Sequence, residues 1–275
     1  MRVDAITGIG GVANAELLLV ASPGLATVGV GFAEDLDFLG SGAEATINVG
    51  RAPSSFTALD SSPLPAGGSV LIATLSGAGE PLGGQLVTLT GGSRTAQTFT
   101  DGYGRVRLDT ADGFPSGAYS VAVTYDGNDR YEPATAVNVL IVVYDPTTFV
   151  TGGGWFMTSS PSTGLLSGKK TNIGANMKYK NGTTVPTGSL EFQAKESNVS
   201  FKATTIDWLA ISGNKAEAQG HGTVNGGGGW SFRVVMIDGP DSFTITIWKD
   251  DGSTTYALPS YRTSGSLGSG NVVVH

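Results

Sequence analysis

Apolar and polar residues alternate in short runs along almost the whole chain, and glycine-rich turns separate these runs. Within the segment 118–125, Val121, Val123 and Tyr125 occupy every second position, so they share one face of a predicted strand. The segment 242–249 alternates in the same way. A period of two residues is typical of a half-buried β-strand, and we therefore predict an all-β protein.

The alternation and the turn signals divide the chain into many short predicted strands. In the first half they comprise 54–58, 69–75, 85–90, 95–100, 105–110, 118–125 and 135–144. In the second half they comprise 148–155, 170–179, 189–196, 200–206, 208–212, 216–224, 231–237, 242–249, 254–258 and 270–275. Short antiparallel strands with a turn roughly every 8–12 residues fit an immunoglobulin-like (Ig-like) β-sandwich. For the second half we predict a separate antiparallel β-sandwich or jelly-roll-like domain.

An internal repeat runs through the first half of the chain. Residues 22–49 are echoed by residues 115–142 at a constant offset of 93, without a gap. The matched pairs include Gly24/Gly117, Val28/Val121, Val30/Val123, Phe32/Tyr125, Phe38/Tyr131, Ile47/Leu140 and Val49/Val142. A period of about 90 residues corresponds to one Ig-sized sandwich.

The first copy of this repeat has no room for its front half, because the counterpart of Ser54 would precede Met1. We therefore expect the chain to begin inside a repeat, as a fragment of a longer protein does. Residues 1–51 would supply only the last three strands of a sandwich and would present open edges. We expect this orphan segment to be frayed, to pack on the next domain or to pair with another copy.

Composition changes abruptly near residue 145. All eight lysines and all four tryptophans lie after it, whereas every basic residue before it is an arginine. We predict three domains, which comprise residues 1–51, 52–146 and 147–275. The chain carries a formal charge of −7, which argues against binding to nucleic-acid phosphates. Cysteine is absent, so disulfides, thiolate metal sites and cysteine nucleophiles are excluded.

Two patterns resemble bacterial families. A Thr-Asp-x-x-Gly turn, a Gly-x-Tyr-x-Val segment and an aromatic residue before Asp-Gly resemble the Ig-like repeats of bacterial secreted and cell-surface proteins. The matching residues are Thr100, Asp101, Gly104, Gly117, Tyr119, Val121, Tyr125, Gly127 and Tyr131. "VTGGGWF", "DSFTITIWKDDG" and "GNVVVH" are similar to parts of the domain that follows choice-of-anchor regions (post-COAP type) in bacterial surface proteins. The first resemblance implies a spacer or adhesion-stalk role, and the second implies no activity for named residues.

Histidine is scarce, so any Ser-His-Asp triad must use His221 or His275. His221 lies between Gly220 and Gly222 on a predicted strand, where the glycines permit close approach of another chain or a ligand. The ordinary alternative is a strand histidine that donates one hydrogen bond. If the chain is an enzyme, the candidate catalytic residues are His221, Asp207 and Glu191.

Asp126, Asn128 and Asp129 could place oxygen atoms around a calcium ion. The equivalent loop of the first copy replaces two of these three ligands, and a turn rich in Asp and Asn is the ordinary alternative. We expect no bound metal and no organic cofactor.

Aromatic residues are concentrated in the second half of the chain. The candidates for a ligand platform are Trp155, Trp208, Trp230, Trp248 and Tyr256. Flat aromatic faces stack on the C–H surfaces of sugar rings, although core packing is the ordinary role of such residues. Strict alternation from Phe243 puts Trp248 on the face opposite the core.

These observations favour a non-catalytic spacer and presentation fragment of a secreted or cell-surface bacterial protein. One alternative is a carbohydrate- or polymer-binding module that uses the tryptophan-rich second half. A second alternative is a hydrolase whose site lies in the same half. Expected partners are a polysaccharide or another surface protein, and the orphan strands could mediate self-association. No stretch is long enough to span a membrane, and we presume that a signal peptide is lost with the missing N-terminus.

Overall fold

The computed structural model describes residues 3–8, 10–16, 22–59, 63–159, 162, 164–180, 182–250 and 261–275. Over these residues the chain is almost entirely β-structure, and its helical pieces are two single-turn 3-10 helices, η1 (Thr110–Asp112) and η2 (Lys195–Ser197). The all-β prediction is therefore confirmed. Within the same residues, no helix has both the length and the apolar character that crossing a membrane requires.

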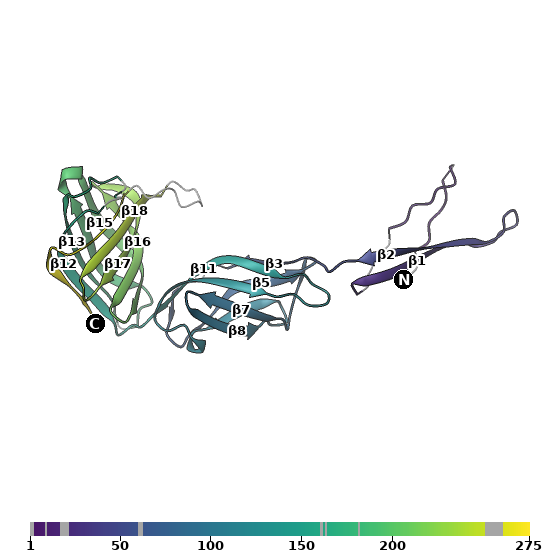
Figure 1. Cartoon of the computed structure of the whole chain (residues 1–275), viewed down its shortest axis with the longest axis horizontal. Coiled ribbons are helices and arrows are strands. Elements are labelled where there is room, and N and C mark those ends of the chain that lie inside the picture. Colours follow the sequence, from purple (N-terminus) through teal and green to yellow (C-terminus); the bar gives the residue numbers. More distant parts are fainter. Residues whose placement is uncertain are drawn as a thin grey trace.

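The strands form three groups that follow one another along the molecule (Figure 1). The ribbon consists of β1 (Gly24–Phe32) and β2 (Ser41–Val49). The sandwich consists of β3 (Ser54–Ala58), β4 (Leu64–Pro65), β5 (Ser69–Gly77), β6 (Glu80–Pro81), β7 (Leu86–Gly91), β8 (Arg94–Phe99), β9 (Arg105–Asp109), β10 (Gly117–Tyr125) and β11 (Ala134–Tyr144). The C-terminal sheet consists of β12 (Phe149–Met157), β13 (Lys170–Tyr179), β14 (Pro186–Ala194), β15 (Val199–Ser212), β16 (Lys215–Val224), β17 (Gly227–Ile237), β18 (Ser242–Lys249), β19 (Tyr261–Ser266) and β20 (Ser269–Val274).

The sandwich has two sheets that face each other across one apolar core. One sheet has the order β4-β11-β10-β7-β8, and the other joins β3, β5 and β6, with β9 also paired to β5. The alternation predicted for β10 is present, because Val121, Val123 and Tyr125 are all buried in this core. Phe114 is fully buried beside them, and its ring meets Tyr119 edge-on. This core is the one that the period-two pattern predicts.

The ribbon leaves its apolar face open. Its register places Val28 opposite Ala45 and Val30 opposite Ala43, so these residues lie on one face. On this face Val30 is 70% exposed and Phe32 is 45% exposed. A single parallel bridge at Ala52 ties the following residues to the sandwich. Within the described residues, β1 and β2 form a two-stranded sheet, so each strand has a neighbour on one side.

The ribbon lacks the register shift that its counterpart in the sandwich contains. β10 and β11 contain a bulge next to Val121, which faces Val139 rather than the residue that an unbroken register would give. β1 and β2 pair without a break. The position of Val139, which is buried in the sandwich core, corresponds to the polar Thr46 in the first copy. Unbroken pairing places the apolar Ile47 on the face of Ala26 instead. The ribbon thus lacks the bulge of the second copy and has a polar threonine where the second copy has a core valine.

The C-terminal sheet follows chain order, β12 to β19, and β20 returns to pair with β12. β19 and β20 are the two outermost strands in this order, and only Leu267 and Gly268 join them along the chain. The sheet therefore curls until its two edges meet (Figure 1). Its halves then face one another across a single core, which is sandwich-like but without the crossovers of a jelly roll. The largest fully buried side chains in it are Phe156, Phe192, Phe201, Phe232, Phe243 and Met177.

The pairing of β20 with β12 brings the last residue back to the start of the C-terminal sheet. The backbone amides of Phe149 and His275 each donate to the other's carbonyl, at 3.1 and 2.9 Å. Their rings stack with centroids 4.1 Å apart. The first and last strands of this sheet are therefore direct neighbours.

Several strand predictions differ from the observed C-terminal sheet. The predicted strands 200–206 and 208–212 form one continuous strand, β15, because bulges absorb the irregular residues between them. β19 was not predicted, since its glycine and serine residues do not alternate clearly with apolar ones. The predicted strand 254–258 lies outside the described residues.

The repeat offers a matched pair of positions for testing whether the ribbon face is open. Val121 is fully buried in the sandwich, whereas Val28 is only half-buried in the ribbon. We expect Val121→Ala to lower the free energy of unfolding of the sandwich by about 2 kcal/mol, because it removes two methyl groups from a packed core. Val28→Ala should change it by less than about 0.5 kcal/mol. Urea unfolding would show both, and equal losses would mean that the ribbon face is covered.

Candidate functional site

A polar cluster lies on the outer face of the C-terminal sheet. It contains Asp207 of β15, His221 of β16, Ser231 of β17 and Asp250, which follows β18 directly. On β17, Ser231 alternates with the buried core residue Phe232, and this alternation places Ser231 on the outer face. Two of these four residues, Asp207 and His221, are among the predicted catalytic candidates.

Hydrogen bonds and close contacts connect the four side chains. The Ser231 hydroxyl donates to Oδ1 of Asp250 at 2.6 Å. Since that hydroxyl has one proton, Nδ1 of His221 is the donor in its 2.9 Å contact with Ser231 Oγ. Asp207 Oδ2 lies 3.3 Å from Nε2 of His221, and Asp250 Oδ2 lies 3.4 Å from Nδ1. The imidazole is therefore held between two carboxylates.

Irregular pairing of β15 brings Asp207 to the histidine. β15 has two register shifts against β16, and Asp207 is the extra residue of the second one, between Ile206 and Trp208. A bulge bends a strand and turns the extra side chain in a new direction. The bulge at Asp207 is therefore the local reason why the carboxylate of this residue reaches the ring of His221.

The glycines beside His221 make room for the bulged strand. A Cβ atom at Gly220 would lie 2.2 Å from the carbonyl oxygen of Thr205. A Cβ atom at Gly222 would lie 2.4 Å from the carbonyl oxygen of Lys202 and 2.6 Å from the ring of Phe201. The close neighbour of these glycines is therefore a strand of the same chain, β15.

The arrangement disfavours acyl transfer at Ser231. A serine nucleophile needs a base that accepts its proton and donors that stabilise the oxyanion. Here the proton of Ser231 is directed at Asp250, and Nδ1 of His221 donates to Oγ instead of accepting from it. The carboxylate of Asp250 lies 2.6 Å from that oxygen, and its negative charge would oppose the charge of an attacking alkoxide. The cluster presents hydrogen-bond acceptors and does not resemble a nucleophile with its base.

Glu191, the third catalytic candidate, lies elsewhere. It is on β14, and β15 separates it from the strand of His221. Its carboxylate forms an ion pair with Lys202 at 3.3 Å. The structure therefore brings together Asp207 and His221 but not Glu191.

The five predicted aromatic platform residues have different surroundings. Trp208 is buried with Val142 of the sandwich, and Trp230 stacks on Tyr261 with centroids 5.7 Å apart. Lys170 lies over the ring of Trp155 at 4.5 Å. Trp248 is half-buried on the outer face, opposite Ser231 in the pairing of β17 with β18. Tyr256 lies outside the described residues.

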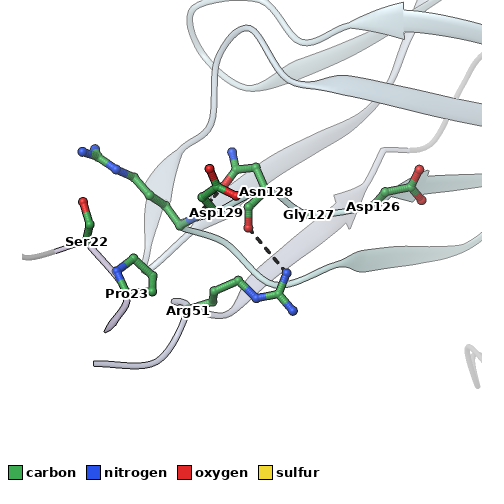
Figure 2. A pocket seen from close by; sticks show the side chains of 8 residues that line it. Ser22, Pro23, Arg51, Asp126, Gly127, Asn128 and Asp129 are labelled. Atoms are coloured by element: carbon green, nitrogen blue, oxygen red, sulfur yellow. Dashed lines mark hydrogen bonds between the residues drawn. The ribbon is translucent and has the colours of Figure 1, made fainter. Parts of the chain in front are cut away.

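The calcium candidates line an open hollow of about 880 Å³ between the ribbon and the sandwich (Figure 2). The side-chain oxygen of Asn128 accepts hydrogen bonds from the backbone amides of Arg130 and Tyr131, as in an ordinary turn. Figure 2 shows Asp126 pointing away from Asp129, while Arg51 reaches the Asn128 carbonyl. Among the described residues, no group of three or more His, Asp or Glu side chains is arranged to hold a metal ion.

Two members of the cluster, Ser231 and Asp250, are not among the predicted site residues. An Asn-Gly hairpin turn at Asn225-Gly226 joins β16 to β17, and counting outward from it pairs His221 with Trp230. A register shift between Gly222 and Val224 moves the partner by one residue, to Ser231. The turn was a usable signal for the hairpin, but the shift was not visible in the sequence.

Comparison of the chain with protein-family models, with curated proteins and with solved structures finds no match. The resemblances to bacterial Ig-like repeats and to a post-COAP-type domain therefore stay predictions.

The close approach of β15 can be tested with two glycines of the same sheet. Gly222→Ala would force a methyl group against the Lys202 carbonyl, and we expect a loss of about 1–3 kcal/mol in the free energy of unfolding. Gly228→Ala is the control, because a Cβ atom there meets nothing within 4 Å. Thermal unfolding would distinguish the two, and a neutral Gly222→Ala would contradict the tight approach.

Proposed function

We propose that this chain is a non-catalytic spacer and presentation module of a secreted or cell-surface bacterial protein. In this role the sandwich holds the C-terminal sheet in a fixed direction. The observation that carries the proposal is the junction between these two bodies. A spacer that presents a domain needs a stiff joint, and this joint is packed rather than loose.

Tyr144 is the centre of the junction. It is the last residue of β11, and its carbonyl accepts a hydrogen bond from the amide of Ala66 in the sandwich at 2.9 Å. Its ring, however, is buried in the core of the C-terminal sheet. There it stacks on Tyr179 with centroids 4.3 Å apart. One residue thus belongs to the backbone of one body and to the core of the other.

Tyr179 is itself fixed in the C-terminal sheet. Its hydroxyl donates to the carbonyl of Leu209 at 2.8 Å and accepts from the Leu209 amide at 3.1 Å. Burial of the side chain raises the pKa of this phenol well above its ordinary value. The ring that receives Tyr144 therefore stays neutral and oriented.

A second contact lies beside the first. Trp208 and Ala210 of β15 are buried against Val142 of β11. The guanidinium of Arg233 lies over the Trp208 ring at 5.5 Å and is bound to Glu217 at 2.8 Å. Two separate contacts resist both bending and rotation at the joint, whereas a single contact would act as a pivot.

The connection itself is short and internally bonded. Four residues separate β11 from β12. The amide and the hydroxyl of Thr147 both donate to Oδ1 of Asp145, and the hydroxyl of Thr148 donates to the Asp145 carbonyl. These bonds close a tight turn and shorten the free length of the linker.

Two sequence properties add support to an extracellular spacer role. The repeat at an offset of 93 is typical of proteins built from tandem modules. The resemblance to bacterial Ig-like repeats implies the same class of protein. The hydrolase alternative is weakened by the bond from Ser231 to Asp250.

Rigidity can be measured directly because the chain has no cysteine to interfere with labelling. Spin labels at Phe99→Cys and Met157→Cys, both exposed positions, would report the distance between the two bodies. We expect a narrow distance distribution in the native chain. Trp208→Ala should broaden it, because it removes about 2–3 kcal/mol of apolar burial from the joint.

Trp248→Ala is the matched control, since that tryptophan lies on the outer face of β18, away from the joint. Its distance distribution should equal the native one. A native distribution as broad as that of Trp208→Ala would overturn the spacer proposal.

The junction should also loosen in acid. The hydroxyl and amide of Thr147 hold the pKa of Asp145 below its ordinary value of 3.8. A lowered pKa in the folded state contributes stability above the ordinary value, and this contribution disappears as the pH falls through the lowered pKa. Thr147→Val removes the hydroxyl donor, so we expect the pKa of Asp145 to rise toward its ordinary value. Titration of the Asp145 carboxyl carbon by NMR would measure it, and an unchanged pKa would contradict this turn.

A further inference from the structure

We propose that the outer-face cluster of Asp207, His221 and Asp250, together with Trp248, binds a saccharide chain that carries no acidic groups. The inference rests on the proposed role of the C-terminal sheet as the presented body. Four features of the site support it: the position of the aromatic ring, the exposed acceptors, the rigidity of the cluster and its charge.

The aromatic ring lies in the same row as the polar groups. His221 of β16 faces Ser231 of β17, and Ser231 faces Trp248 of β18. Side chains that are directly opposite on one face of a sheet have Cβ atoms about 4.5–5.5 Å apart. The indole of Trp248 therefore borders the cluster. A sugar ring that stacks on it would place its hydroxyl groups over the carboxylates.

The polar groups that face solvent are those that suit sugar hydroxyls. The side chain of His221 is 54% exposed, and those of Asp207 and Asp250 are 38% and 37% exposed. An ionised carboxylate offers only acceptors, which match the donor protons of a sugar. Ser231, by contrast, is 5% exposed and braces the other groups from beneath.

The cluster is held in place before any ligand arrives. His221 contacts Ser231 and both carboxylates, so its ring orientation is defined on both sides. The backbone below it is fixed by the close contact of Gly220 and Gly222 with β15. A rigid site loses little conformational entropy on binding, which favours weakly interacting ligands such as sugars.

Charge decides the class of saccharide. Two carboxylates flank one imidazole, so the site carries no excess of positive charge. Arg233, on the same face of β17, is already bound to Glu217 at 2.8 Å. An acidic polymer would meet repulsion here, whereas a neutral or amine-bearing one would not.

The other tryptophans are committed elsewhere. Trp208 is part of the junction with the sandwich, and Trp230 packs on the core beside Tyr261. The ring of Trp155 covers Gly268 and receives Lys170. Trp248 is therefore the tryptophan whose neighbours form a polar, exposed surface.

Affinity gel electrophoresis of the full chain would test the proposal. The probes are hydroxyethyl cellulose as a neutral polymer, glycol chitosan as an amine-bearing one and polygalacturonate as an acidic one. We expect retardation by the first or the second and none by the third. Trp248→Ala should raise the dissociation constant by up to about tenfold, as expected for the loss of one stacked ring. Asp207→Asn should weaken it as well, since it keeps the shape but removes the charge.

Trp155→Ala is the matched control and should keep native retardation. Each variant must show the native thermal midpoint, and Asp207→Asn keeps the test decisive if Trp248→Ala fails to fold. Retardation by none of the polymers, retardation by polygalacturonate alone, or full binding by both site variants would overturn the proposal. The distance distribution between the two bodies is a separate measurement, so failure of this site leaves the spacer proposal standing or falling on its own result.

Discussion

The architecture depends on the double placement of Tyr144. Its backbone is hydrogen-bonded within the sandwich, while its ring completes the core of the C-terminal sheet beside Tyr179. Neither body can move far without breaking either a ladder hydrogen bond or a buried aromatic contact. Trp208 adds a second point of contact, which removes the rotation that one point would allow. The orientation of the outer face of β15 to β18 relative to the sandwich follows from these two side chains.

Much of the fold could be predicted from the alternation of apolar and polar residues. The pattern around Val121 gave the core strand of the sandwich, and Phe243 to Ile247 gave the inner face of β18. The change in composition near residue 145 coincides with the connection between β11 and β12. The burial of Trp208 could not be predicted, because its partner Val142 is 66 residues away in the sequence. Local patterns carry no information about such a contact.

The candidate site shows where sequence reasoning ends. The glycines on either side of His221 correctly indicated a close neighbour. The identity of its polar partners depends on register shifts in β15 and β16, which deliver Asp207 and Ser231 to the imidazole. A shift of one residue exchanges the two faces of a strand, so a prediction that misses it selects Trp230 in place of Ser231. The register shifts that bring the four side chains together are therefore also the reason why the sequence did not predict the whole cluster.

The neighbouring placement of β12 and β20 has a mechanical meaning. The chain enters the C-terminal sheet at Phe149, and the hydrogen-bonded partner of Phe149 is His275. A force applied between the sandwich and the end of β20 would act on two adjacent antiparallel strands at the same end. Such a load peels the strands apart one pair at a time, whereas a load along opposite ends would shear all pairs together. The C-terminal sheet would therefore be a mechanically weak link if tension passed through it from the sandwich to the end of β20.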